Sequence, residues 1–190
     1  AMVRPFLPDE TQLVGLFSGD ADVSWRSDGS LPTGRVALKG RGVKVTQDVQ
    51  GNALPIAFDT LNLNAGMRDG RAELDWLLRI ANNGQFDGKV QIGDPQKRRT
   101  LSGNININNI SLALLNPALM RGEKVAGILS SNLRLGGDLQ RPQVYGQLGL
   151  RDVDIDGSFM PVDLNSANLN MVFNGMRSTL EGLIQTAHGQ

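Results

Sequence analysis

The chain has 190 residues, and its 19 Lys and Arg side chains equal its 19 Asp and Glu side chains, so its formal net charge is zero. A neutral chain lacks the positive field that non-specific nucleic-acid binding needs, and we expect no nucleic-acid partner. The absence of cysteine excludes a disulfide framework, a thiolate metal site and a cysteine nucleophile. The longest aliphatic run, Leu112 to Leu115, is far shorter than the roughly 18 apolar residues of a membrane helix.

Short runs of alternating apolar and polar residues follow one another along most of the chain, separated by Gly, Asn and Asp. This pattern predicts β-strands joined by hairpins. The segment before them, residues 5–17, is compatible with one helical turn. The candidate strands are residues 21–25, 35–38, 43–45, 55–59, 61–65, 71–77, 86–92, 104–108, 133–135, 148–150, 153–155, 161–164, 169–173 and 179–184.

The clearest alternation is Asn104 to Asn108, where isoleucines and asparagines fall on opposite faces of a strand. Only residues 110–120 break this rhythm, because their apolar positions fit a helical stripe, which Pro117 limits in length. A dozen or more strands against one short helix predict an all-β architecture.

The chain also repeats itself at an offset of 112 residues. This offset pairs Gly15 with Gly127, Val36 with Leu148 and Leu38 with Leu150. We therefore expect a single fragment, residues 1–190, of a longer repeating structure, with a first repeat at about 5–114 and a truncated second repeat at about 115–190. The final His188-Gly189-Gln190 resembles the strand start Asn83-Gly84-Gln85 and indicates an excised piece.

Strands with one apolar face must cover something apolar, and one short helix cannot shield so many strands. The sheet either folds on itself as a filled sandwich or curls without closing and leaves an apolar hollow. An aromatic content of only 5% slightly favours a partly unfilled lane, although composition alone still favours the filled core.

The motif that most resembles a metal site is Asp152-Val-Asp154-Ile-Asp156-Gly157, with Asp163 at its twelfth position, as in a calcium loop. The intervening Val and Ile alternate with the acids as in a strand, and no amphipathic helices flank the segment. We therefore expect an outward-facing strand rather than a cation site. The single histidine, His188, cannot form a triad or a metal site alone, and we expect no enzyme, cofactor or metal.

Three segments carry a resemblance to a known family. NNGQFDGKVQI, RGEKVAGILSSNLRLGGDLQRPQ and VDIDGSFMPVDL followed by FNGMRSTLEG resemble the C-terminal region of the AsmA-like TamB family. The resemblance implies an elongated, curled, incompletely closed sheet with a hydrophobic interior, the periplasmic portion of an inner-membrane-anchored protein. It further implies the outer-membrane barrel TamA as a partner, docked outside this fragment, within the translocation and assembly module.

The resemblance implies two kinds of cargo: phospholipids and outer-membrane proteins, including autotransporters. From the one-sided apolar pattern we expect a conduit that shields acyl chains. The residues expected to line its groove are Val36, Leu38, Phe58, Leu61, Leu63, Leu74, Leu101, Ile105, Ile107, Leu133, Leu135, Leu148, Leu150, Ile155, Leu169, Met171 and Phe173.

Two alternatives remain at this stage. The free edges of an open sheet could pair with strands of an unfolded outer-membrane protein, as a chaperone would. A filled β-sandwich could instead serve as a structural spacer.

Overall fold

A computed structural model describes residues 11–24, 33–93, 99–120, 122–157 and 164–186. Within them lie ten strands and one 3₁₀ helix. The strands are β1 (Thr11–Ser24), β2 (Thr33–Val49), β3 (Asn52–Arg68), β4 (Arg71–Ile80), β5 (Gln85–Ile92), β6 (Leu101–Ser111), β7 (Lys124–Gly137), β8 (Pro142–Asp156), β9 (Leu164–Gly175) and β10 (Arg177–Thr186), and the helix is η2 (Leu112–Ala118).

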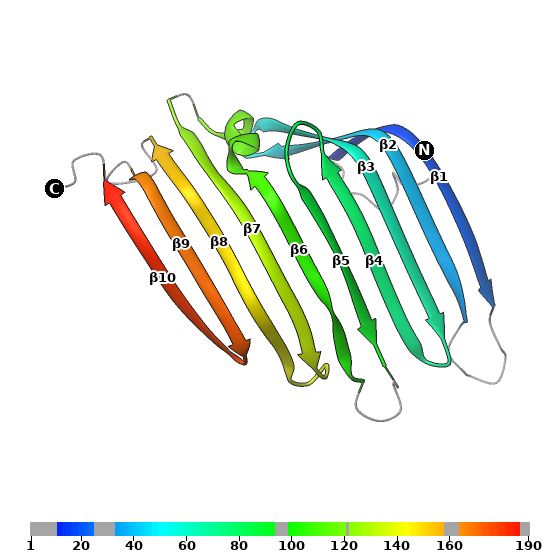
Figure 1. Ribbon diagram of the computed structural model, residues 1–190. Helices are drawn as coiled ribbons and strands as arrows, with labels where there is room; N and C mark the ends of the chain where they lie inside the picture. The colour runs from blue at the N-terminus through cyan, green and yellow to red at the C-terminus, as the bar shows by residue number, and fades with distance from the viewer. Residues whose placement is uncertain (1–10, 25–32, 94–98, 121, 158–163, 187–190) are drawn as a thin grey trace.

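The ten strands form a single antiparallel sheet in which spatial order follows chain order from β1 to β10. Figure 1 shows the strands side by side in one curved layer, with β1 and β10 at opposite edges. The expected all-β, curled and incompletely closed sheet of consecutive hairpins is thereby confirmed. The filled sandwich is not: the described residues form one sheet, whereas a sandwich needs two.

The described strands are fewer and longer than expected, because some apparent turns are β-bulges. Residues 35–38 and 43–45 both belong to β2, and residues 55–59 and 61–65 both belong to β3. The register shifts at Gly42-Val43 in β2, and Asp59 is an extra residue in β3. A bulge accommodates one additional residue without ending the strand, so a Gly or Asp within a strand imitates a turn signal.

Two helical segments were predicted, one near the start of the chain and one in its middle, and among the described residues only the second is a helix. Residues 11–17 form the first part of β1 rather than a helical turn, and residues 5–10 lie outside the described part. The short helix expected near 110–120 is confirmed as η2, capped by the Ser111 hydroxyl, which accepts a hydrogen bond from the Ala113 N–H. Pro117 lies inside this single short helix.

One bulge geometry occurs twice, in β1–β2 and in β7–β8. Gly15 faces Gly42 and Val43, while Gly127 faces Asp152 and Val153. The two facing glycines share a φ of 150°, and Gly42 and Asp152 have φ values of 54° and 55°. The two valines are 0% and 3% exposed. The facing glycines are 112 residues apart and the two valines 110. The repeat and its boundaries stay a prediction.

The sheet buries little of its own apolar surface. Val43, Leu54, Val153 and Ala167 are the buried apolar side chains among the described residues. The accessible surface is 13215 Å², against about 8,800 Å² for a compact monomer of this mass. The large surface follows from the single-layer architecture, in which no second sheet covers the first.

Two aromatic side chains pack over glycines of the neighbouring strand, where the lack of a side chain leaves room for the ring. Trp76 pairs with Gly88 across β4 and β5, and Phe17 pairs with Gly40 across β1 and β2. A Cβ atom at Gly88 would lie 2.4 Å from Trp76 Cζ2 and 2.8 Å from the Asn104 carbonyl oxygen. The indole therefore lies over the glycine, and Trp76 also contacts Phe86, with ring centroids 5.4 Å apart.

We expect Gly88→Ala to destabilise the sheet, because the added methyl group must displace the indole and the backbone of β6. Overpacking of this kind costs about 1–3 kcal/mol, measurable as a lower midpoint in urea unfolding. The matched control is Gly66→Ala in β3, where the nearest atom to the new Cβ lies 3.7 Å away. That control is expected to leave stability unchanged or to raise it by up to about 1 kcal/mol. Equal effects of the two substitutions would contradict the packing argument.

Candidate functional site

The strand register separates the side chains into two faces, because directly paired residues point to the same side of a sheet. Ile105 of β6 pairs with Gly88 on one side and Leu133 on the other. The row continues through Trp76 and Leu63 to Leu38. We call the side that carries Ile105 the apolar face, and the opposite side the outer face.

The register places every residue expected to line the groove on the apolar face. None of them is buried: Val36 and Leu74 are 47% and 44% exposed, and the others are intermediate. Aliphatic side chains at this level of exposure form a surface that still gains from being covered. Their role in holding acyl chains stays a prediction. The residues so placed are Val36, Leu38, Phe58, Leu61, Leu63, Leu74, Leu101, Ile105, Ile107, Leu133, Leu135, Leu148, Leu150, Ile155, Leu169, Met171 and Phe173.

The apolar face contains further residues that the sequence reasoning did not select. Trp76, Leu78 and Phe86 share it in β4 and β5, and Val90 and Leu129 extend it. The signal was available, since Leu74, Trp76 and Leu78 alternate with period two. Because Leu77 and Leu78 are consecutive, the sequence alone left it open which of the two faces inward.

Two polar groups interrupt the apolar face. Ser131 of β7 is 6% exposed, and its hydroxyl donates a hydrogen bond of 2.8 Å to the Gln147 carbonyl oxygen. This bond satisfies the hydroxyl within the sheet. The Trp76 indole N–H is buried without a hydrogen-bond partner. With its hydroxyl satisfied in this way, Ser131 leaves the face predominantly apolar.

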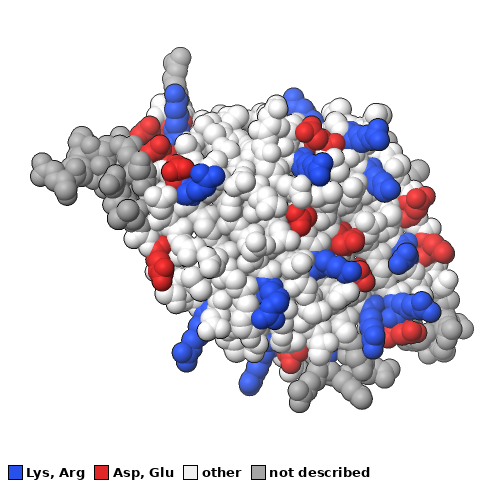
Figure 2. Space-filling view, in the orientation of Figure 1, with Lys and Arg blue, Asp and Glu red and all other residues white. Residues whose placement is uncertain are grey.

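The outer face carries the charged residues, and Figure 2 shows them spread across the side turned to the reader. Glu73 and Lys89 form an exposed ion pair between β4 and β5, with Oε1 and Nζ 2.9 Å apart. The hydrogen bond from Lys89 lowers the pKa of the Glu73 carboxyl, and the same bond raises the pKa of Lys89. Farther along, the Arg134 guanidinium lies 4.4 Å from the centre of the Tyr145 ring.

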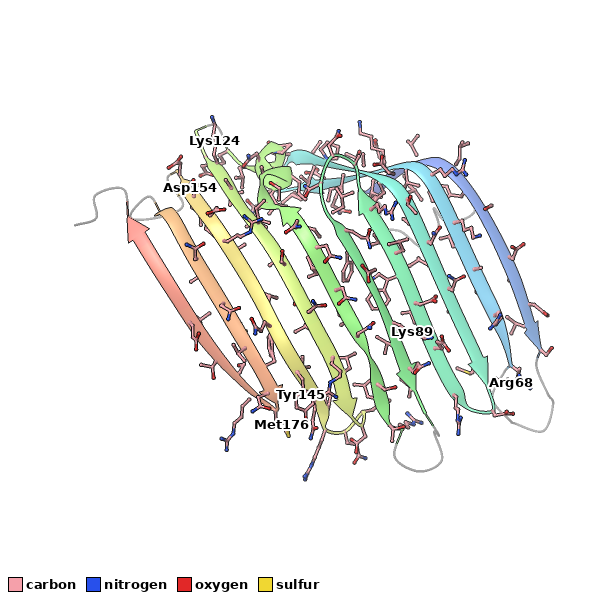
Figure 3. All side chains as sticks on the ribbon, viewed as in Figure 1. Arg68, Lys89, Lys124, Tyr145, Asp154 and Met176 are labelled. Carbon is pink, nitrogen blue, oxygen red and sulfur yellow. The ribbon has the colours of Figure 1, made fainter. Side chains whose placement is uncertain are left out.

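Figure 3 places these outer groups along the strands. Lys89 lies on β5, whereas Tyr145, Arg68 and Met176 lie at the lower end of the sheet. Lys124 of β7 and Asp154 of β8 lie at its upper end. Met176 is 71% exposed. Charged side chains therefore occur on the outer face at both ends and in the middle of the sheet, as a one-sided amphipathic sheet requires.

A shallow hollow of about 360 Å³ opens on the outer face over β3 to β6. Asn106 donates a hydrogen bond of 3.1 Å to Asp87, while Asp75 Oδ1 is buried without a partner. The described residues contain no cluster of three or more His, Asp or Glu side chains suited to a metal. The hollow is lined chiefly by polar side chains of neighbouring strands: Asn62, Asn64, Asp75, Asp87, Lys89, Asn104 and Asn106.

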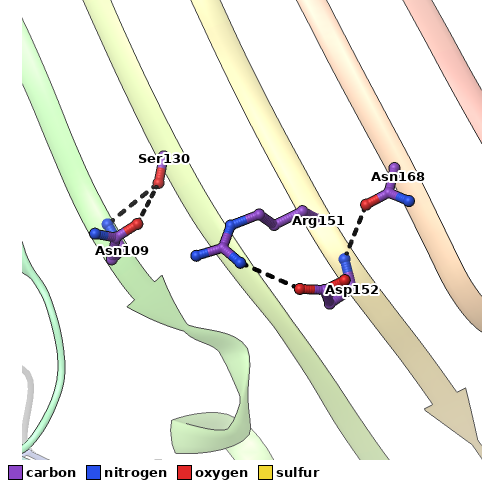
Figure 4. A network of polar contacts seen from close by, with 5 residues as sticks. All are labelled: Asn109, Ser130, Arg151, Asp152 and Asn168. Carbon is purple, nitrogen blue, oxygen red and sulfur yellow. Dashed lines mark hydrogen bonds and ion pairs between the residues drawn. The ribbon is translucent and has the colours of Figure 1, made fainter.

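The calcium-like segment lies in β8 as an outward strand with a bulge. Figure 4 shows Asp152 held by Arg151 Nη1 at 3.2 Å, while its own N–H donates to Asn168 Oδ1 at 3.1 Å. Nearby, the Ser130 hydroxyl donates to Asn109 Oδ1 at 3.1 Å. Asp154 and Asp156 belong to the same strand, whereas Asp163 and His188 lie outside the described residues.

Among the described residues, no helix has the length and apolar character needed to cross a membrane.

Comparison with known proteins identifies the family. The family described as "TamB, N-terminal domain" matches residues 1–150. The translocation and assembly module subunit TamB of Haemophilus influenzae is 28% identical over 180 residues, which cover 95% of this chain but only 14% of that relative. No solved structure matches the chain. The resemblance had suggested the C-terminal region, whereas the matching family is described as the N-terminal domain. At the level of the family the match is unambiguous, and the chain belongs to the TamB family.

Proposed function

We propose that this chain is one section of a hydrophobic conduit that shields the acyl chains of phospholipids between two membranes. The observation that carries the proposal is the continuous apolar face, which extends across all ten strands with its aliphatic side chains half-exposed. A sheet that folded only for stability would gain from covering this face. A face that remains open is suited to an apolar guest that comes and goes.

The free energy at stake is large enough to require such a surface. An acyl chain of about 16 carbons leaving a membrane meets a cost on the order of 12 kcal/mol in water, at about 0.8 kcal/mol per CH₂. Contact with Leu, Ile and Val side chains offsets much of this cost. The proposal needs no catalytic group, since the guest is sheltered and not changed.

The composition of the face also supports weak and non-selective binding. Its side chains are almost entirely aliphatic or aromatic, and Ser131 already donates its hydroxyl proton to the protein. Because aliphatic and aromatic side chains form most of the face, an acyl chain gains similar contact energy at successive positions along the strands. The head group would remain in water at the open side of the sheet.

Family membership extends the proposal to a cellular setting. We infer that the chain acts in the periplasm as part of an inner-membrane-anchored protein of the translocation and assembly module, with the outer-membrane barrel TamA as partner. Because the chain spans 14% of the length of the Haemophilus influenzae relative, it would form one section of a longer wall. Segments of outer-membrane proteins, including autotransporters, are a second class of apolar guest that the same face could shelter.

The decisive variant is Ile105→Asp, which places a carboxylate in the middle of the apolar face. Burial of an unpaired carboxylate against an acyl chain costs more than about 1.4 kcal/mol, so retained lipid should fall at least tenfold. The measurement is native mass spectrometry of the purified chain, supported by lipid extraction. Ile105 is only half-buried, so the substituted side chain stays partly hydrated and the fold is expected to persist.

The matched control is Asn104→Asp, which introduces the same charge one residue away on the outer face. Asn104 pairs with Lys89 and Arg134, so a carboxylate there is well tolerated. Lipid retention should equal that of the unmodified chain. The proposal would be refuted if the purified chain retained no phospholipid, or if both variants lost lipid equally. A lower unfolding midpoint for Ile105→Asp alone would indicate a structural role for Ile105 instead.

The open edges support a second candidate, in which β1 or β10 pairs with an unfolded outer-membrane-protein strand. Each of these strands has a neighbour on one side only within the described sheet. The backbone N–H and C=O groups along the unpaired edge of β1 or β10 could therefore form hydrogen bonds with an added strand.

This second candidate predicts that a peptide taken from an outer-membrane barrel strand binds equally well to the unmodified chain and to Ile105→Asp. Proline variants at Ala21 and Asp22 test the unpaired edge of β1. Of two adjacent residues, one directs its N–H toward β2 and the other directs it away from the sheet, where an added strand would pair. The variant that stays folded should lose peptide binding, as measured by fluorescence anisotropy. Binding that disappears in Ile105→Asp would assign the peptide to the apolar face instead.

A further inference from the structure

The upper ends of β1, β2 and β3 leave the plane of the sheet together. Phe58 of β3 pairs with Ile80, the last residue of β4, so the preceding residues of β3 extend past the end of β4. We call the overhanging part the flap: residues 11–14, 44–49 and 52–57, which stay paired with one another. Figure 1 shows the ends of β2 and β3 running across the top of the sheet toward η2.

The flap is long enough to cross three neighbouring strands. η2 packs against both β7 and β3, although β4, β5 and β6 separate these two strands in the sheet. Four strand spacings span about 19 Å, and the six residues from Asn52 to Ala57 extend about 20 Å. The flap therefore crosses the upper ends of β4, β5 and β6. It does so on the apolar side of the sheet, where Leu112 of η2 approaches Gly127.

The bend at the base of the flap coincides with the bulges. Gly15 of β1 faces Gly42 and Val43 of β2, and Asp59 is the extra residue of β3. Bulges bend a strand and increase its twist, and Gly42, with a φ of 54°, tolerates this backbone without strain. The three strands thus share one crease, on which the flap can turn without losing its own pairing.

The tip of the flap is held by a small set of contacts. The Asn52 side-chain amide donates a hydrogen bond of 3.3 Å to the Ala118 carbonyl oxygen at the end of η2. Leu54, two residues along, is 8% exposed. At the base, the Ala81 N–H donates to the Ala57 carbonyl oxygen at 2.8 Å. The Asn52 side-chain hydrogen bond is thus one contact at the tip, beside the packing of β3 against η2, and such a bond contributes about 1 kcal/mol.

We propose that the flap is a gate at the upper end of the apolar face, held closed by the Asn52 hydrogen bond to η2 and by the burial of Leu54. When it is closed, it ends the path of an acyl chain over β4 to β6. When it turns outward on the crease, it exposes upper residues such as Ile107 and lengthens that path. The inference rests on the proposed lipid-binding function, whereas the hinge motion can be measured without lipid.

The motion is tested by cysteine labelling, for which the chain is suited because it contains no cysteine. Leu54→Cys reports flap opening through its rate of reaction with N-ethylmaleimide. Adding Asn52→Ala removes the hydrogen bond to η2 and should accelerate labelling about three- to tenfold. Asn62→Ala, on the outer face of the same strand, is the matched control and should leave the rate unchanged.

A second cysteine position separates gate opening from general loosening. Ala167→Cys in β9, 1% exposed and distant in strand order from the flap, should label at the same rate with and without Asn52→Ala. Acceleration at both positions would mean that the sheet has loosened as a whole, and an unchanged rate at Leu54→Cys would mean that Asn52 does not hold the flap. Either result overturns the gate.

The effect on lipid is tested with a photoreactive benzoylphenylalanine at Ile107 or at Leu74, using vesicles of phosphatidylethanolamine and phosphatidylglycerol. Asn52→Ala should increase phospholipid adducts at Ile107 several-fold and leave those at Leu74 unchanged. Adducts at Leu74 with no response at Ile107 would refute the gate and retain the conduit. No adducts at either position would refute the conduit, and with it a gate for lipid.

Discussion

The structure depends on the pairing of every strand with its neighbours in one layer. This pairing satisfies the backbone groups, and it forces the side chains of paired residues onto a common side. Because apolar residues alternate in phase from β1 to β10, the result is a sheet with one apolar and one polar face. A single layer has nothing of its own with which to cover the first face. The proposed function follows from this uncovered side.

Local pattern was sufficient to predict the faces and insufficient to predict the ends of strands. The alternation of Ile105 and Ile107 with Asn104 and Asn106 identified the inward side, since a strand has period two whatever lies around it. The strand breaks predicted between residues 38 and 43 and after Asp59 are bulges instead, because a turn and a bulge both need a residue that tolerates unusual backbone. The distinction depends on the neighbouring strand, which local sequence does not contain.

The flap shows a second limit of sequence reasoning. Asn52 and Ala118 are 66 residues apart, and neither has a local pattern that points to the other. Their contact arises because β3 extends beyond the end of β4 by the six residues 52–57, which is a difference of strand length and not of composition. Trp76 alternates with Leu74 and Leu78, but its position over Gly88 depends on the pairing of β4 with β5, which is not a local signal. A mismatch of strand lengths becomes visible only once the strands are paired.

The sequential order of the strands has a consequence for how the protein forms. Since β1 through β10 pair in chain order, every strand pairing in the described sheet joins strands that are consecutive in the polypeptide. The architecture is quasi-one-dimensional, and its stability approximates a sum of nearest-neighbour terms. Growth can therefore proceed hairpin by hairpin as the polypeptide emerges, without waiting for distant segments. Such a sheet can be lengthened during evolution by duplicating hairpins, with no central core to redesign.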